Sequence, residues 1–279
     1  MDLVQSLVKG NVFCTKMNLA WIGISMFSEG YPSRGTHWFF TFSQKSQGTM
    51  GRRLRSRVST TMLGLEGTSF LEPLKVPQAE NCLYLNIWTP EAMEGNNYAV
   101  LIWIHGGGFD WGAGTTVVYM GDALTAYNDV VMVSINYRLN GFGFLSTGDN
   151  GIPGNFGIWD QHEAIKWVHT HIAKFGGDPD RITLFGQSAG AGSVGFHIVS
   201  PYSRDYFNNG ILMSGSPYWV GNNIDGARNS AFRAGRNLGC DDVVTSDQLL
   251  KCMQEIDEET FAYEMISTPS GPILDYDSS

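Results

Sequence analysis

The sequence lacks several features that would have assigned it to a class at once. Residues 19–27 (LAWIGISMF) form an apolar stretch of nine residues, far short of the roughly 20 that a membrane-spanning helix needs. No Asn-x-Ser/Thr sequon occurs, so glycosylation gives no support for secretion. Nothing in the sequence indicates a metal or organic cofactor, and we therefore expect the protein to work without one.

Basic charge is scarce in most of the chain. Residues 1–79 hold 9 Lys and Arg against 4 Asp and Glu, whereas residues 80–279 hold 9 against 23, and the net charge of the chain is −9. An acidic body argues against nucleic acid as a partner, because nucleic-acid binding needs a basic face. The arginine cluster at 52–57 is interpreted as a solvated loop, with contact to an anionic surface as the alternative.

Residues 1–79 fit poorly with the rest of the chain, because their periodicity is weak and Ser, Thr, Gly and Arg are frequent. The stretch 19–27, preceded by Lys9 and Lys16, is compatible with the apolar region of a signal peptide, although no cleavage site is clear. An alternative or mispredicted N-terminus over residues 1 to about 75 is the other interpretation. We expect a divergent segment over residues 1–79 and one domain over residues 80–279.

From residue 80 onward, short apolar runs alternate with helical patterns. Residues 83–89 alternate apolar and polar positions as a half-buried strand does, and the apolar runs 100–104, 130–135, 184–185 and 211–213 predict further strands. Helical spacing predicts a helix through Ile158 and Ile172 that ends at Gly176, and another through Ala227 and Leu238 that ends at Gly239. This alternation predicts an α/β fold with a mostly parallel central sheet and crossover helices.

The most informative motif is Gly186-Gln187-Ser188-Ala189-Gly190. An apolar strand pattern precedes it, and small residues followed by Val194 and Phe196 begin a helix after it. A G-x-S-x-G sequence between a strand and a helix is typical of the nucleophile elbow, in which the serine sits on a sharp, strained turn. We interpret Ser188 as a nucleophile; an ordinary glycine-rich turn is the alternative.

A second motif strengthens this interpretation. The apolar run 100–104 leads into His105-Gly106-Gly107-Gly108-Phe109, an HGGG-type loop that supplies backbone N–H groups to an oxyanion hole. His105 is interpreted as a residue that fixes this loop. Both motifs follow strands, and ligands of α/β folds bind at the carboxyl ends of strands, so the expected fold and the expected chemistry agree.

These motifs resemble those of the type-B carboxylesterase/cholinesterase family of α/β-hydrolases. The resemblance also rests on residues 80–86 (ENCLYLN), 134–138 (SINYR), 151–178, 213–216 (MSGS), Cys240 and Cys252. The segments GFGFLSTGD and WDQH are most similar to those of the bile-salt-activated lipase and liver carboxylesterase branches. The resemblance is continuous from about residue 80 to the last residue.

The resemblance implies roles for several residues. It implies an oxyanion hole formed by the N–H groups of Gly107, Gly108 and Ala189, and it pairs Cys240 with Cys252 in a disulfide, which points to a secreted or secretory-pathway protein. Two reduced thiols in a cytosolic protein are the alternative. It also implies a structural ion pair, because Glu80 and Arg138 match positions that form a buried ion pair in the family. The family partner of Cys82 lies upstream; Cys14 is the remaining candidate, without a geometric reason for that pairing.

Histidine placement limits the chemistry. In α/β-hydrolases the acid and then the histidine follow the serine, but the last histidine here, His197, lies only nine residues beyond Ser188. At about 1.5 Å per helical residue it is roughly 13 Å away, too far to accept the proton. His162, His169 and His171 precede the serine and are interpreted as surface or helix-edge residues. We expect the catalytic acid and histidine to be missing, so that this chain represents roughly the N-terminal half of an esterase domain.

One departure from the family pattern lies beside the nucleophile. The family usually has Glu before the serine, and this chain has Gln187, which weakens any preference for cationic substrates. The expected function is hydrolysis of small-molecule or lipid carboxylic esters through an acyl-enzyme on Ser188. A catalytically inactive fragment and a neuroligin-like adhesion protein are the alternatives, and the retained serine favours the enzyme. A parallel sheet cut in half would leave an exposed edge and poor solubility.

Overall fold

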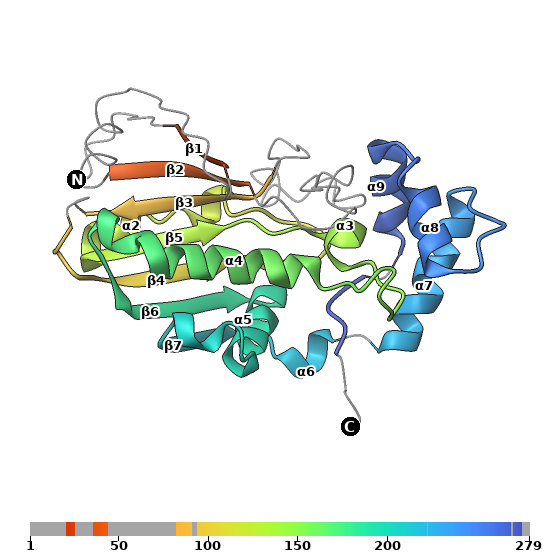
Figure 1. Cartoon of the computed structure of the whole chain (residues 1–279). Helices are drawn as coiled ribbons and strands as arrows, with labels where there is room; N and C mark the ends of the chain where they lie inside the picture. Colours follow the sequence, from red (N-terminus) through yellow and green to blue (C-terminus); the bar gives the residue numbers. More distant parts are fainter. Residues whose placement is uncertain are drawn as a thin grey trace, which may run out of the picture.

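The computed structural model describes residues 21–25, 36–43, 82–90, 94–221, 223–268 and 270–274. Within these ranges the strands form a sheet in the order β1-β2-β3-β5-β4-β6-β7 (Figure 1). The strands are β1 (Trp21–Ser25), β2 (Thr36–Ser43), β3 (Tyr84–Thr89), β4 (Tyr98–Ile104), β5 (Val130–Ile135), β6 (Gly177–Gln187) and β7 (Asn209–Met213).

Helices fill most of the connections after β4. The α-helices are α2 (Asp122–Asn128), α3 (Asn140–Phe144), α4 (Phe156–His171), α5 (Ala189–Val199), α6 (Pro217–Val220), α7 (Ile224–Asn237), α8 (Ser246–Met253) and α9 (Glu258–Ile266). The 3-10 turns are η3 (Val117–Tyr119), η4 (Ile172–Phe175) and η5 (Arg204–Tyr206). No helix in the described ranges is both long and apolar enough to cross a membrane.

The sheet is mixed, and its parallel half carries the site. Strands β5, β4, β6 and β7 run parallel to one another. The pairs β1–β2, β2–β3 and β3–β5 are antiparallel. Helices α4 and α5 form the crossover connections of the parallel strands, because two strands that run in the same direction can be joined only by a long connection. The predicted α/β fold is confirmed, and the strands and helices expected after residue 80 are all present.

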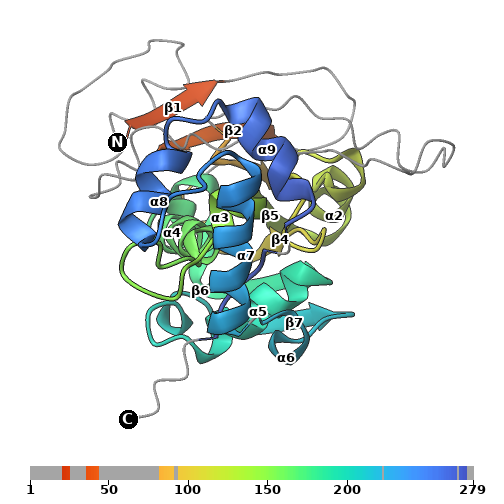
Figure 2. The same ribbon diagram turned by 90° about the vertical axis from the view of Figure 1, so that its right-hand side faces the viewer.

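The two faces of the sheet bury different side chains. Val100, Ile102 and Ile104 of β4 pack in the main core with α4, whereas Trp103 lies in a separate cluster on the other face with Trp88 and Met132. A Cβ built on Gly121, just before α2, would lie 2.4 Å from the Met132 side chain, which places α2 on this second face. Figure 2 shows α2 and α4 on opposite sides of the sheet.

Strand β3 is more deeply buried than its alternating sequence predicts. Leu85 through Thr89 are all buried, so the expectation of a half-buried strand is wrong. Two of its polar side chains donate internal hydrogen bonds: the Asn86 side-chain amide donates to Ser134 Oγ at 3.0 Å, and the Thr89 hydroxyl donates to the Phe175 carbonyl at 2.8 Å. Asn86 Oδ1 is buried without a hydrogen-bond partner. Hydrogen-bonded polar side chains are tolerated in a strand that is covered on both faces.

The strands β1 and β2 lie in the segment that sequence patterns left unassigned. They pair with each other and, through β2, with β3, so they extend the antiparallel side of the sheet. The apolar stretch 19–27 therefore contains a strand of this sheet. The arginine cluster at 52–57 and Cys14 lie outside the described residues.

The opposite edge of the sheet is β7, whose residues are all exposed. Ile211 is 49% exposed, and Leu212 and Met213 are also partly open to solvent, as expected for the edge of a parallel sheet that no further described element covers. The poor solubility inferred from such an edge stays a prediction.

Helices α7, α8 and α9 form a second core at the end of the sheet. Phe142 of α3 packs against Phe261 of α9 with ring centroids 4.8 Å apart, and Leu249 and Met265 are fully buried beside them. Local signals start these helices: the Asn223 side chain caps α7, and Thr245 and Gln248 form a capping box at α8.

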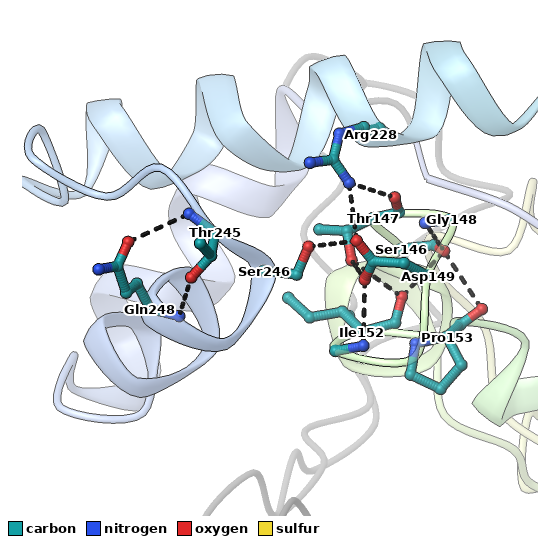
Figure 3. Close-up of polar contacts among 11 residues, drawn as sticks. Ser146, Thr147, Gly148, Asp149, Ile152, Pro153, Arg228, Thr245, Ser246 and Gln248 are labelled. Atoms are coloured by element: carbon teal, nitrogen blue, oxygen red, sulfur yellow. Dashed lines mark hydrogen bonds and ion pairs between the residues drawn. The ribbon is translucent and has the colours of Figure 1, made fainter.

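Asp149 links this helical cap to the loop after α3 (Figure 3). Its carboxylate accepts hydrogen bonds from Thr147 Oγ1 at 2.7 Å, from the Gly151 N–H at 3.0 Å, from Ser246 Oγ of α8 at 2.6 Å and from Arg228 of α7 at 2.8 Å. Burial opposes ionisation, but these hydrogen bonds outweigh it and hold the pKa of Asp149 well below its ordinary value.

A disulfide joins Cys240 to Cys252, with their Cα atoms 6.0 Å apart and a sequence separation of 12. The pairing implied by the family resemblance is confirmed. The bridge ties the end of α7 to α8. Cys82 is buried at the start of β3.

We expect Asp149→Asn to lower the free energy of unfolding by about 1 to 2 kcal/mol at pH 7, because an amide is a weaker acceptor and loses the ion pair with the half-exposed Arg228. The difference in unfolding free energy between the wild type and the variant should disappear as the pH falls below about 4. A carboxylate whose pKa is lowered in the native state contributes its full stability only above its pKa in the unfolded state. Chemical denaturation at several pH values measures this. The exposed Asp241→Asn is the matched control, and equal losses in the two variants would contradict the linking role.

The double variant Cys240→Ser, Cys252→Ser should unfold with a free energy about 3 kcal/mol lower than the wild type, from the loop-closure entropy of so short a loop. Urea denaturation with and without reductant checks it. Reductant should destabilise the wild type and leave the double variant unchanged; a reductant effect on both would show that the bridge is not its cause.

Candidate active site

Ser188 lies between β6 and α5 in a backbone conformation that L-residues rarely adopt, with φ 55° and ψ −120°. The turn is held from two sides: the Ser188 N–H donates to the Met213 carbonyl of β7 at 2.9 Å, and the Ser188 carbonyl accepts from the Gly192 N–H of α5 at 3.0 Å. Such strain persists only where surrounding structure enforces it, and here it turns a partly exposed serine outward at the carboxyl end of β6.

The glycines around Ser188 are required by close backbone contacts. A Cβ on Gly190 would lie 2.0 Å from the Ile104 carbonyl oxygen, and one on Gly186 would lie 2.5 Å from the backbone of Gly190. A Cβ on Gly106 would lie 2.5 Å from the Gln187 carbonyl oxygen and 3.2 Å from Ser188 Cβ. The G-x-S-x-G turn and the HGGG loop are therefore in direct contact, which the sequence alone does not show.

The HGGG loop makes a tight turn beside Ser188. Gly107 and Gly108 have positive φ values of 114° and 67°, and the N–H groups of Asp110 and Trp111 donate to the Gly107 carbonyl at 3.0 and 3.2 Å. Left-handed backbone of this kind favours glycine. The assignment of Gly107, Gly108 and Ala189 as oxyanion donors stays a prediction, which the contact between Gly106 and Ser188 supports.

His105 anchors this loop from below. It is buried, stacks on Tyr137 with ring centroids 4.5 Å apart, and contacts the Gly106 carbonyl through Nδ1 at 2.9 Å; the Tyr137 hydroxyl donates to the His105 carbonyl at 2.8 Å. Burial lowers the pKa of His105 to about 4, so the ring is neutral at pH 7. These contacts agree with a role in fixing the loop.

Two more histidines form a buried network beneath the nucleophile helix. Ser203 Oγ lies 2.9 Å from His162 Nδ1 and 2.9 Å from His197 Nδ1, and His197 Nε2 lies 3.0 Å from Gln161 Oε1. The amide of Gln161 donates to Ser193 Oγ of α5 at 3.1 Å. His162 is 8% exposed, so its interpretation as a surface or helix-edge residue is wrong; His169 and His171 are partly exposed, as expected.

The chemistry of these groups fixes the direction of every hydrogen bond. Gln161 uses its amide on Ser193, so its oxygen accepts from His197 Nε2–H, and a neutral His197 then accepts from the Ser203 hydroxyl through Nδ1. Ser203 in turn accepts from His162 Nδ1–H. Burial first, and the neighbouring His162 second, lower the pKa of His197 to about 3. Both nitrogens of His197 are thus engaged away from Ser188, in agreement with its exclusion as the base.

Arg138 finds a partner that the sequence did not identify. Its guanidinium makes two bonds of 2.7 Å to the Asp160 carboxylate, and its backbone N–H adds a third at 3.0 Å. This ion pair joins the segment after β5 to α4. Glu80, the expected partner, lies outside the described residues.

Met213 and Gly215 are further supports of the elbow. Met213 accepts the Ser188 N–H, and a Cβ on Gly215 would lie 2.2 Å from the Ser188 carbonyl oxygen. Their sequence, MSGS, carried the family resemblance without revealing this contact. Among the described residues, no group of three or more His, Cys, Asp or Glu side chains is arranged to hold a metal ion.

A serine on a strained strand–helix turn at the carboxyl edge of a parallel sheet, packed against a glycine loop from the neighbouring strand, defines an α/β-hydrolase. The model of the carboxylesterase family matches residues 31–275. The chain belongs to the carboxylesterase family. The match begins upstream of residue 80, where the motifs first become recognisable, so the family likeness extends into the N-terminal segment. The expected boundary between a divergent segment and the domain at residue 79 stays a prediction.

Similar proteins include acetylcholinesterase of Electrophorus electricus, 44% identical over 200 residues that cover 71% of this chain and 31% of that protein. Acetylcholinesterase of Gallus gallus is 45% identical over 186 residues, covering 66% of this chain and 24% of its own length. Cholinesterase 1 of Branchiostoma lanceolatum is 44% identical over 187 residues, which cover 66% of this chain and 52% of that protein. The chain thus spans from about a quarter to about half of these relatives.

The buried histidines predict a pH-dependent stability. The native pKa values of His197 and His105 lie below the unfolded value of about 6.5, so unfolded chains bind protons first and stability falls as the pH drops below about 6.5. Between pH 7 and pH 5, each of these two buried imidazoles should lower the free energy of unfolding by about 2 kcal/mol. His197→Gln should flatten this decline by that amount, and His171→Gln much less. Urea denaturation across this range measures it, and parallel profiles for wild type and His197→Gln would contradict the assignment.

Proposed function

We propose that this protein hydrolyses carboxylic esters through an acyl-enzyme on Ser188. The observation that carries the proposal is the strained Ser188 turn in direct contact with the HGGG loop. In this arrangement the serine oxygen attacks the ester carbonyl, and the N–H groups of Gly107, Gly108 and Ala189 stabilise the negative charge that develops on the carbonyl oxygen.

The contacts of the described histidines support the absence of a general base from the described side chains. Within them, no hydrogen bond joins the Ser188 hydroxyl to a histidine, and His105, His162 and His197 are each held in other contacts. We propose that the catalytic acid and histidine are missing from this chain, and that the 279-residue chain alone is inactive. A serine without a base is a weak nucleophile.

The substrate class is an uncharged or charged small-molecule or lipid ester. Gln187 is exposed directly before the nucleophile and carries no charge. It therefore offers a cationic substrate no electrostatic attraction at this position. A neuroligin-like binding protein is the alternative function. The intact elbow favours the enzyme, because a binding protein has no need of a strained serine.

The Cys240–Cys252 disulfide supports a secreted or secretory-pathway location, since disulfides persist in oxidising compartments. The acidic net charge argues against a nucleic-acid partner.

A fluorophosphonate probe, which reacts with activated serines, tests this proposal. The 279-residue chain should remain unlabelled, and a polypeptide extended to the length of its relatives should be labelled at Ser188. Ser188→Ala in the extended form should abolish labelling, whereas Ser267→Ala, at an exposed serine, should leave it unchanged. Labelling of the 279-residue chain that Ser188→Ala removes would show that a base is already present. An extended chain that stays unlabelled would favour the binding protein.

A further inference from the structure

The edge of the sheet beside the nucleophile is built from segments without formal charge. Residues 182–203 and 206–224 contain no Asp, Glu, Lys or Arg, and the two residues between these segments, Arg204 and Asp205, have opposite charges. The segments hold most of β6 and all of α5, β7 and α6. In a chain with a net charge of −9, this edge can lose its water without desolvating a charged group.

Large apolar side chains are exposed along this edge, which we call the β7–α6 edge. The exposed members are Ile198 and Val199 at the end of α5, Tyr202 in the loop that follows, Ile211, Leu212 and Met213 of β7, and Tyr218 and Trp219 of α6. The last two are the most open, because Tyr218 is 88% exposed and Trp219 is 79% exposed. Single exposed apolar residues are ordinary, whereas a group of them on neighbouring elements marks an interaction surface.

The elements of the β7–α6 edge pack directly against one another. A Cβ built on Gly210 of β7 would lie 2.8 Å from Ile198 Cδ1 at the end of α5. A Cβ built on Gly195 of α5 would lie 2.5 Å from the Pro217 ring of α6 and 3.4 Å from Leu212 Cδ2 of β7. Figure 1 and Figure 2 both show α5, β7 and α6 together at the lower edge of the molecule, so the exposed side chains belong to one continuous surface.

This surface adjoins the nucleophile. Met213 of β7 pairs with Gln187 of β6, and its carbonyl accepts the N–H of Ser188 at 2.9 Å. Gly215 follows β7 and leads into α6, and a Cβ built on it would lie 2.2 Å from the Ser188 carbonyl oxygen. A molecule that rests on the β7–α6 edge is therefore beside Ser188.

The composition of the edge favours a lipid surface over a second copy of the chain. Tyr and Trp combine an apolar ring with a polar O–H or N–H group, and they are enriched where hydrocarbon meets water. Two copies of this chain, each with a net charge of −9, repel one another, whereas a zwitterionic lipid surface has no net charge. The uncharged edge thus suits an uncharged lipid surface.

We propose that the β7–α6 edge docks on the surface of zwitterionic lipid aggregates, with the rings of Tyr218 and Trp219 inserted among the head groups. Docking places lipid esters beside Ser188, so the substrate class of this site is esters in aggregated lipid. The substrate class rests on the proposed function, whereas docking itself needs no acyl chemistry.

The test is flotation of the 279-residue chain with phosphatidylcholine vesicles. The wild type should float with the vesicles, and the double variant Tyr218→Ser, Trp219→Ser should lower the partition coefficient about tenfold, because two exposed aromatic rings are lost. Neither ring is buried, so the double variant should keep the fold. Tyr127→Ser is the matched control: Tyr127 is also 88% exposed, but it lies on α2, and its loss should leave flotation unchanged.

Head-group charge and salt identify the forces involved. Phosphatidylglycerol vesicles should bind less of the wild type than phosphatidylcholine vesicles do, because the lipid and the chain are both negatively charged. High salt should leave binding to phosphatidylcholine unchanged, since apolar contacts are not screened.

Ser188→Ala should dock like the wild type, so a failure of the proposed ester chemistry would leave the docking result intact. Absence of flotation of the wild type, equal flotation of the double variant, or stronger binding to phosphatidylglycerol would overturn the inference. A stable wild-type dimer in light scattering that the double variant loses would assign the edge to a second copy and overturn it as well.

Discussion

The backbones of β4, β6 and α5 approach one another closely where these elements meet, and the site depends on this contact. At Gly190 the first turn of α5 lies against the Ile104 carbonyl, and at Gly106 the glycine loop lies against Ser188. Any side chain at these positions would separate the nucleophile from the loop that is proposed to stabilise its intermediate. The strained φ of Ser188 is maintained because β7 and α5 each bind one of its backbone groups.

The layers beneath this contact are polar as well as apolar. The chain of hydrogen bonds from His162 to Ser193 runs from α4 to α5 through the loop that bears Ser203, and it keeps two imidazoles buried. A buried hydrogen-bond network of this kind fixes the position of α5 more specifically than apolar packing does, because hydrogen bonds are directional. Asp149 has a comparable role in the helical cap, where it holds α7 and α8 to the loop after α3.

The sequence by itself determined the α/β class, the strand–serine–helix turn, the glycine loop and the pairing of Cys240 with Cys252 through family resemblance. These follow from local patterns: apolar runs bounded by glycine, and motifs whose residues are adjacent in the chain. Only the tertiary structure decided that His162 is buried, that Arg138 pairs with Asp160, that β3 is covered on both faces and that residues 21–25 and 36–43 join the sheet. Each of these depends on segments that are separated along the chain and brought together by folding, and such contacts override the local pattern of polarity.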